Sequence, residues 1–181
     1  MFKQFIAAIA VVATLATPIF AAEFTDEQLE GLEARIESFD AAMKSSDMSQ
    51  VMDVVPPKVL DKIAANFNVT TEQLIEATQQ QMDQVMKDVE IVSFGMDLEA
   101  AEFFETADGT AYALIPTETV MDLGAAGGKV RATSSTLGLF DEETWYLVRV
   151  EDAQQVAILK EVYPAFADVE FPTGSMEPVT E

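Results

Sequence analysis

The stretch TAYALIPTETVMDLGAAGGKVRATSSTLGLF, residues 110–140, decides the fold class of this 181-residue chain. β-branched and aromatic side chains alternate with polar ones on both sides of a glycine-rich centre, which is typical of two strands joined by a flexible turn. A connection this short joins antiparallel neighbours, because a parallel pair needs a crossover of about a dozen residues or more. The stretch therefore predicts a hairpin at the centre of an antiparallel meander.

Similar alternation continues on both sides of this hairpin. Asp108 and Gly109 mark a hairpin turn ahead of it, and the acidic run 141–143 marks a tight turn after it. We expect strands at about 90–98, 101–107, 110–122, 129–140 and 144–150.

Helical signals precede the strands. Thr25 with Gln28, and Thr70 with Gln73, form two capping boxes, and Pro57 suits the first turn of a helix between them. Apolar side chains then recur at spacings of three and four, which indicates amphipathic helices. We expect one buried stripe at Leu29, Leu32, Ile36, Phe39 and Met43, and a second at Leu74, Met82, Val85 and Met86.

The chain after the strands predicts one further helix and a tail. Asp152 can cap a helix that continues through Val162 and is ended by Pro164. Residues 173–181 are expected to form a disordered tail. Helices first and a curved antiparallel sheet after them define a single α+β domain over residues 22–172, with helices packed on the sheet.

The N-terminal residues have the pattern of a secretory signal peptide, residues 1–21. Lys3 precedes an apolar run that ends at about Thr17, and the small residues Ala21 and Ala22 follow Pro18. We expect cleavage after Ala21 and a periplasmic or secreted location in a bacterium. No other apolar run approaches the roughly 20 residues of a transmembrane helix, so we expect no membrane anchor.

Charge and composition exclude several classes of function. The chain has 32 acidic and 10 basic residues, a formal net charge of −22, so nucleic acids and anionic membrane surfaces are poor partners. It contains neither histidine nor cysteine, which removes imidazole catalysis, thiol chemistry and zinc sites built on those residues. No calcium-loop motif occurs. We expect no metal ion and no cofactor.

The order of these elements resembles the NTF2-like superfamily, whose fold is a cystatin-like cone, and more narrowly exported bacterial members of unassigned function. The resemblance covers about residues 25–165 and departs from the family in two ways. The family often has a strand among its early helices, where this chain has only Val54 and Val55, and the C-terminal helix is an addition. The resemblance rests on AAMKSSDMSQVMDVVPPKVL (41–60), TTEQLIEATQQQM (70–82), TAYALIPTETVM (110–121) and ETWYLVRVED (143–152).

The resemblance implies a cone that, in some relatives, encloses a pocket for a small molecule. Enzymatic relatives use Asp, His or Tyr for isomerisation or dehydration. None of those catalytic patterns matches this chain residue by residue, so no catalytic residue is carried over.

Strand alternation predicts a candidate binding patch on one side of the sheet. It assumes that Asp122 pairs with Lys129 across the glycine-rich turn, and Leu139 with Trp145 across the acidic turn. Two arginines could then bind an anion or a carboxylate between aromatic walls. Alternatively, a glutamate and an arginine of the set form a structural ion pair facing solvent, and a one-residue register error would reverse the faces. The candidate residues are Tyr112, Glu118, Arg131, Trp145 and Arg149, with Glu118 and Arg131 as the alternative ion pair.

Two kinds of side chain fit either a core or a surface role. Trp145, the only tryptophan, alternates with Leu147 in a strand, which favours the core over the wall of a site. The nine methionines could form an adaptable surface for partners. However, Met82, Met86 and Met121 lie on apolar stripes, which favours core filling.

These features predict a non-catalytic exported domain that binds a small molecule or peptide, or that forms a homodimer through its sheet. One alternative is an isomerase or lyase with a buried carboxylate base, for which Glu118 and Asp97 are the candidates. A second alternative is a structural partner in an envelope complex. An enclosed apolar pocket of roughly a few hundred Å³ would favour binding or catalysis, and a filled interior would favour scaffolding.

Overall fold

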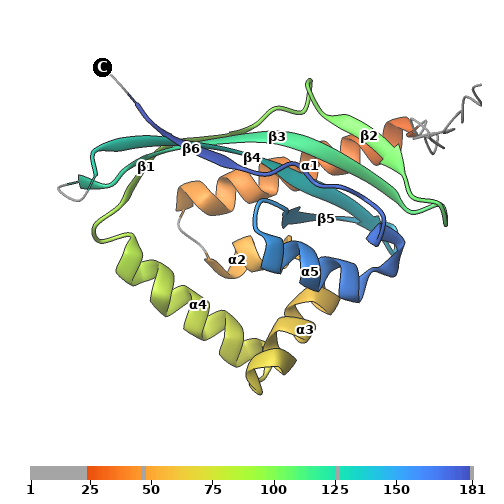
Figure 1. Cartoon of the computed structure of the whole chain (residues 1–181), viewed down its shortest axis with the longest axis horizontal. Coiled ribbons are helices and arrows are strands. Elements are labelled where there is room, and N and C mark those ends of the chain that lie inside the picture. The colour runs from red at the N-terminus through yellow and green to blue at the C-terminus, as the bar shows by residue number, and fades with distance from the viewer. Residues whose placement is uncertain (1–23, 46–47, 125–126, 180–181) are drawn as a thin grey trace, which may run out of the picture.

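The computed structural model describes residues 24–45, 48–124 and 127–179, so the expected signal peptide and its cleavage site lie outside the described residues. Its architecture is α+β, as predicted: helices come first, a curled antiparallel sheet follows, and a helix lies near the C-terminus (Figure 1). None of the helices within those ranges is both long and apolar enough to cross a bilayer. The elements are α1 (Asp26–Ser45), α2 (Met48–Asp53), α3 (Pro57–Phe67), α4 (Thr71–Val85), β1 (Glu90–Met96), β2 (Glu102–Glu105), β3 (Ala111–Asp122), β4 (Lys129–Asp141), β5 (Thr144–Arg149), α5 (Ala153–Val162), the 3₁₀ helix η2 (Pro164–Phe166) and β6 (Ser175–Pro178).

The sheet has two long central strands and two interrupted edges. β3 pairs with β4 from Tyr112 opposite Leu139 to Asp122 opposite Lys129, which confirms the register predicted across the glycine-rich turn. β1 and β2 pair with the two halves of β3 on one side, and β5 and β6 pair with the two halves of β4 on the other. Each edge is therefore built from two short strands in succession.

The expectation of a disordered tail from residue 173 is wrong for the described part of that segment. β6 pairs antiparallel with β4, from Thr133 opposite Ser175 to Val130 opposite Pro178. All four side chains of β6 are exposed, so this strand is held by backbone pairing with β4 and by a hydrogen bond between the Ser175 and Thr133 hydroxyls (2.8 Å). β5 covers only the end of β4 nearest the acidic turn, which leaves edge positions of β4 for the tail. Because β6 contributes no buried side chain, no hydrophobic pattern in residues 175–178 indicates it.

The predicted helix caps are present. The backbone N–H of Gln28 donates to Thr25 Oγ1 (3.2 Å), and the Thr25 N–H donates to Gln28 Oε1 (3.0 Å). Thr70 and Gln73 form the same reciprocal pair at the start of α4. Asp152 Oδ1 accepts from two N–H groups at the start of α5. These bonds satisfy donors that a helix start leaves without intrahelical partners.

Both faces of the sheet bury side chains. α1 and Val54 cover one face, where Leu32 meets Ile115 and Trp145 in one cluster. α5 and η2 cover the other face, where Leu159 and Phe166 join the second cluster. α1 thus packs on the sheet as predicted, whereas α4 packs on α3 and α2, and the C-terminal helix adds a core on the opposite side. Burial on two faces removes more apolar surface from water than a one-sided sheet could.

Gly138 of β4 allows α1 to lie close to the sheet. A Cβ atom at this position would lie 3.2 Å from Leu32 Cδ1 and 3.5 Å from Trp145 Cζ3. Leu32 is fully buried at this contact, and Ile36 and Phe39 pack at the border of the same cluster. Leu29, one turn earlier on α1, is 37% exposed, so the predicted first stripe is buried in its middle and open at its start.

The second predicted stripe is largely solvent-exposed. Leu74 is half-buried, but Met82, Val85 and Met86 are 37%, 47% and 38% exposed, so the expectation that they point inward is wrong. α4 packs on α3 and α2, which lie along its first half. The apolar pattern continues along the helix beyond the elements that cover it. Met82, Val85 and Met86 together form the α4 stripe.

Candidate functional site

The five residues of the predicted binding patch do not share one face of the sheet. Phe140, and not Leu139, pairs with Trp145, so Thr136 rather than Ser135 lies opposite Arg149. Trp145 and Arg149 therefore lie on the face opposite to Tyr112, Glu118 and Arg131. The prediction that all five face one way is wrong by a single residue of register in β5.

The turn between β4 and β5 explains this error. Asp141 pairs with Thr144, which leaves a two-residue turn formed by Glu142 and Glu143. Their φ angles are 51° and 61°, in the left-handed region that such a turn requires and that usually selects Asn or Gly. Each non-glycine residue in this region costs about 1–3 kcal/mol. A pair of glutamates gives little indication of so tight a turn, so the sequence predicts a loop between β4 and β5 that is one residue longer.

The two aromatic members of the predicted patch belong to the core. Trp145 is 3% exposed, its ring stacks on Phe24, and its Nε1–H donates to the backbone oxygen of Gln28 (2.7 Å). The favoured core role of Trp145 is thereby confirmed. Tyr112 is buried against Phe104 and Phe166, and burial raises the pKa of its phenol. Neither ring forms the wall of an open site.

The charged members of the patch are paired at the surface. Arg131 Nε lies 3.2 Å from Glu118 Oε2, and both side chains are about half exposed. This is the solvent-facing ion pair given as the alternative interpretation, and such pairs contribute little to stability. Glu118 and Tyr112 are about 20 Å apart along β3, at ~3.4 Å per residue. Arg149 pairs with Glu151.

An open depression of about 640 Å³ crosses the sheet where β1 ends. Asp97 and Glu118, the two candidate carboxylate bases, both border it, together with Thr133 of β4. Both carboxylates belong to exposed residues, so water reaches them freely. Within residues 24–45, 48–124 and 127–179, no cluster of acidic side chains is arranged to hold a metal ion.

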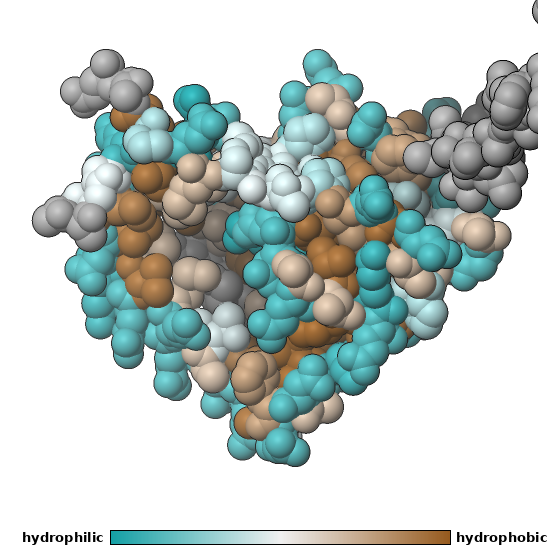
Figure 2. Space-filling model, in the orientation of Figure 1, coloured by the Kyte–Doolittle hydropathy of each residue, from teal (hydrophilic) through white to brown (hydrophobic). Residues whose placement is uncertain are grey.

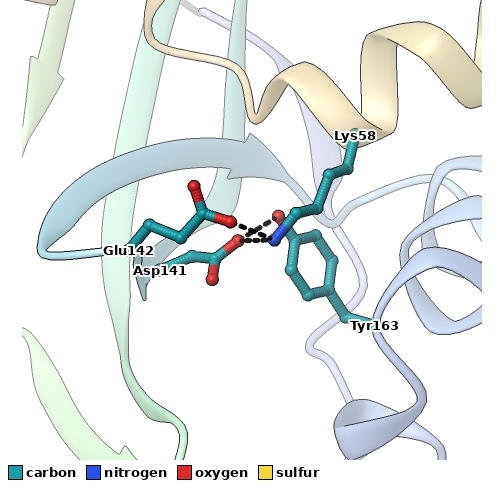
Figure 3. A network of polar contacts seen from close by, with 4 residues as sticks. All are labelled: Lys58, Asp141, Glu142 and Tyr163. Atoms are coloured by element: carbon teal, nitrogen blue, oxygen red, sulfur yellow. Dashed lines mark hydrogen bonds and ion pairs between the residues drawn. The ribbon is translucent and has the colours of Figure 1, made fainter.

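A polar network joins three elements at the acidic turn (Figure 3). Lys58 Nζ at the start of α3 lies 2.6 Å from Asp141 Oδ2 and 3.1 Å from Glu142 Oε1. The Tyr163 hydroxyl, at the end of α5, donates to the same oxygen of Asp141 (3.0 Å). Lys58 also lies over the Tyr163 ring, 5.6 Å from its centroid.

The pKa shifts in this network favour a structural role over a catalytic one. Hydrogen bonds to Asp141 and then Glu142 raise the pKa of Lys58, so its ammonium stays charged. Burial, and secondarily the hydrogen bond to Asp141, raises the pKa of Tyr163, so its hydroxyl stays protonated. The Lys58 ammonium offsets part of the negative charge of Asp141 and Glu142, and the network holds the strained turn against α3 and α5. Sequence patterns gave no indication of Lys58 or Tyr163, because only long-range packing brings them to Asp141.

The remaining candidate is the α4 stripe, which lies open to solvent. The face shown in Figure 2 exposes apolar residues among polar ones. The three side chains of the α4 stripe follow one another at spacings of three and one, which keeps them on one side of the helix. The sequence predicts this apolar stripe from its spacing but places it in the core. Its two methionines therefore lie at the surface and do not fill the core.

No family model matches this chain, and no curated protein or solved structure matches it either. The NTF2-like resemblance rests on the order of the elements, to which the structure adds a curled sheet compatible with a cone.

Proposed function

We propose that this chain is an exported, non-catalytic domain of the NTF2-like type that binds a peptide or another apolar ligand along α4. The observation that carries the proposal is the exposed α4 stripe. Export rests on the leader-like residues 1–21.

The exposure of the α4 stripe has a cost. Full burial of a Val or Met side chain contributes about 1.5–3 kcal/mol, so three side chains left about 40% exposed forgo about 2–4 kcal/mol together. That is a large share of the roughly 5–15 kcal/mol that stabilises a domain. A ligand that covers the stripe would recover part of this free energy, and contiguous exposed apolar surface commonly marks such sites.

Catalysis by a carboxylate base has less support. A base of this kind needs apolar surroundings that hold its proton near neutral pH. Asp97 and Glu118 border an open depression, and Glu118 is engaged with Arg131. The sheet also has packed side chains on both faces around Leu32 and Leu159, where a cone pocket would otherwise lie.

Nile red, a neutral dye that fluoresces in apolar surroundings, tests the binding role. The triple variant Met82→Gln, Val85→Gln, Met86→Gln should lower the dye affinity of mature protein (residues 22–181) about fivefold or more, equivalent to ~1 kcal/mol. The control variant Leu29→Gln, Met176→Gln removes exposed apolar side chains of α1 and β6 and should leave the affinity unchanged. Equal dye affinity in the wild type and the triple variant would refute the proposal.

Export has a separate test. The mass of the protein recovered from a bacterial host that expresses the full chain should correspond to a first residue at Ala22. Recovery of the uncleaved chain from the cytoplasm would refute export without affecting the role of α4.

A further inference from the structure

We infer that the α4 stripe binds a cationic amphipathic helix of another protein. This inference rests on the proposed binding role of α4 and adds the chemistry of the partner.

The shape of the surface fits a helix. Leu74, Ile75 and Thr78 are half-buried in the first half of α4, and the same apolar side of the helix continues into the α4 stripe. The exposed apolar groups lie at the C-terminal end of α4, where they extend a ridge against which a second helix can pack. Methionine at two of the three positions allows the surface to adapt to a partner side chain.

The charge around the stripe selects a cationic partner. Glu72, Glu76 and Asp83 are exposed and lie on one row of α4, because they are separated by four and seven residues. Asp88, just beyond the helix, is also exposed, whereas Lys87 is the only basic residue between Thr71 and Glu90. The ion pairs among the described residues do not engage Glu76, Asp83 or Asp88. These carboxylates are therefore available to basic side chains of a partner.

The same charge argues against two other occupants. A second copy of this chain, with its own net charge of −22, would bring like charges together if its α4 packed on the first. An anionic lipid surface would be repelled in the same way. A helix with an apolar face can pack on the α4 stripe, and lysine or arginine along the borders of that face can pair with the acidic row.

A synthetic peptide provides the direct test. The probe is an 18-residue helix with leucine at heptad positions a and d and lysine elsewhere, labelled with fluorescein and titrated with mature protein in low salt. The triple variant Met82→Gln, Val85→Gln, Met86→Gln should weaken binding about tenfold or more, whereas Leu29→Gln, Met176→Gln should change it by less than about twofold. Glu76→Lys, Asp83→Lys should weaken binding about threefold or more, and this difference should shrink in 0.5 M salt. A peptide with glutamate in place of lysine should not bind.

Several results would overturn the inference. If the glutamate peptide binds equally well, or if the charge-reversed variant binds the lysine peptide normally, the partner is not selected by charge. If sedimentation shows a dimer that the triple variant abolishes, the occupant is a second copy. If neutral phosphatidylcholine vesicles bind and the triple variant prevents it, the occupant is lipid. If the peptide does not bind but Nile red binding still depends on the α4 stripe, only this inference is overturned. If Nile red binding does not depend on the stripe either, the proposed function is overturned as well.

Discussion

Replacement of Leu32 by alanine tests the packing of α1 on the sheet, on which the whole architecture depends. Leu32 is fully buried, and its Cδ1 lies over Gly138 of β4. Removing a fully buried leucine side chain loses its transfer free energy and leaves a cavity, so Leu32→Ala should lower the free energy of unfolding by about 3–4 kcal/mol. Leu29, one turn earlier on the same helix and 37% exposed, is the matched control. Leu29→Ala should cost about 1 kcal/mol or less.

The close approach of α1 to Gly138 predicts that substitutions at positions 32 and 138 affect each other. Gly138→Ala alone introduces a Cβ atom 3.2 Å from Leu32 Cδ1 and should cost about 1 kcal/mol through overpacking. In the double variant with Leu32→Ala, the new methyl group occupies part of the cavity. The double variant should therefore be more stable than the sum of the two single effects by about 1 kcal/mol.

Urea unfolding followed by the fluorescence of Trp145 measures all four variants, because this only tryptophan lies in the same cluster as Leu32. An unchanged dependence on urea would show that the variants alter stability and not the extent of unfolding. If Leu32→Ala costs no more than Leu29→Ala, or if the two effects at positions 32 and 138 simply add, α1 does not pack on β4 as described.

Three further predictions concern other contacts. Trp145→Phe removes the hydrogen bond to the Gln28 backbone and should cost about 1–3 kcal/mol, measured by thermal unfolding; an unchanged melting temperature would contradict this contact. The pKa of Lys58 is raised, so its stabilising contribution is present below the usual lysine pKa of about 10.4 and is lost as the pH rises further. The wild type should therefore lose its stability advantage over Lys58→Met progressively as the pH rises above about 10.4, and an advantage that does not decline at all above this pH would contradict the network. Amide hydrogens that join β6 to β4 should exchange faster than those between β3 and β4, because no side chain of β6 is buried; equal protection by exchange mass spectrometry would refute a weakly held strand.

Much of the local structure could be predicted from neighbouring residues. The capping boxes at Thr25 and Thr70, the strand alternation and the glycine-rich turn each depend on groups a few residues apart, and all are present as expected. Trp145 was also assigned to the core from its neighbours in the strand, because burial of a large aromatic ring in a sheet follows from the strand pattern alone.

The candidate site could not be predicted in the same way. The register of β5 depends on a tight turn with two glutamates in left-handed conformations, and Lys58 of α3 and Tyr163 of α5 contact that turn from distant parts of the chain. A shift of one residue separates Trp145 and Arg149 from the side of the sheet that carries Glu118.

The sequence by itself determined the helices and strands other than β6, where the helices begin, and that the fold is α+β, because these properties arise from interactions over a few residues. Only the tertiary structure decided which apolar stripe is covered. α1 lies over the sheet for most of its length, whereas α4 extends past α3 and α2 and leaves the α4 stripe open to solvent. The physical reason is that an apolar stripe requires burial, but the lengths and directions of the surrounding elements determine whether anything lies against it.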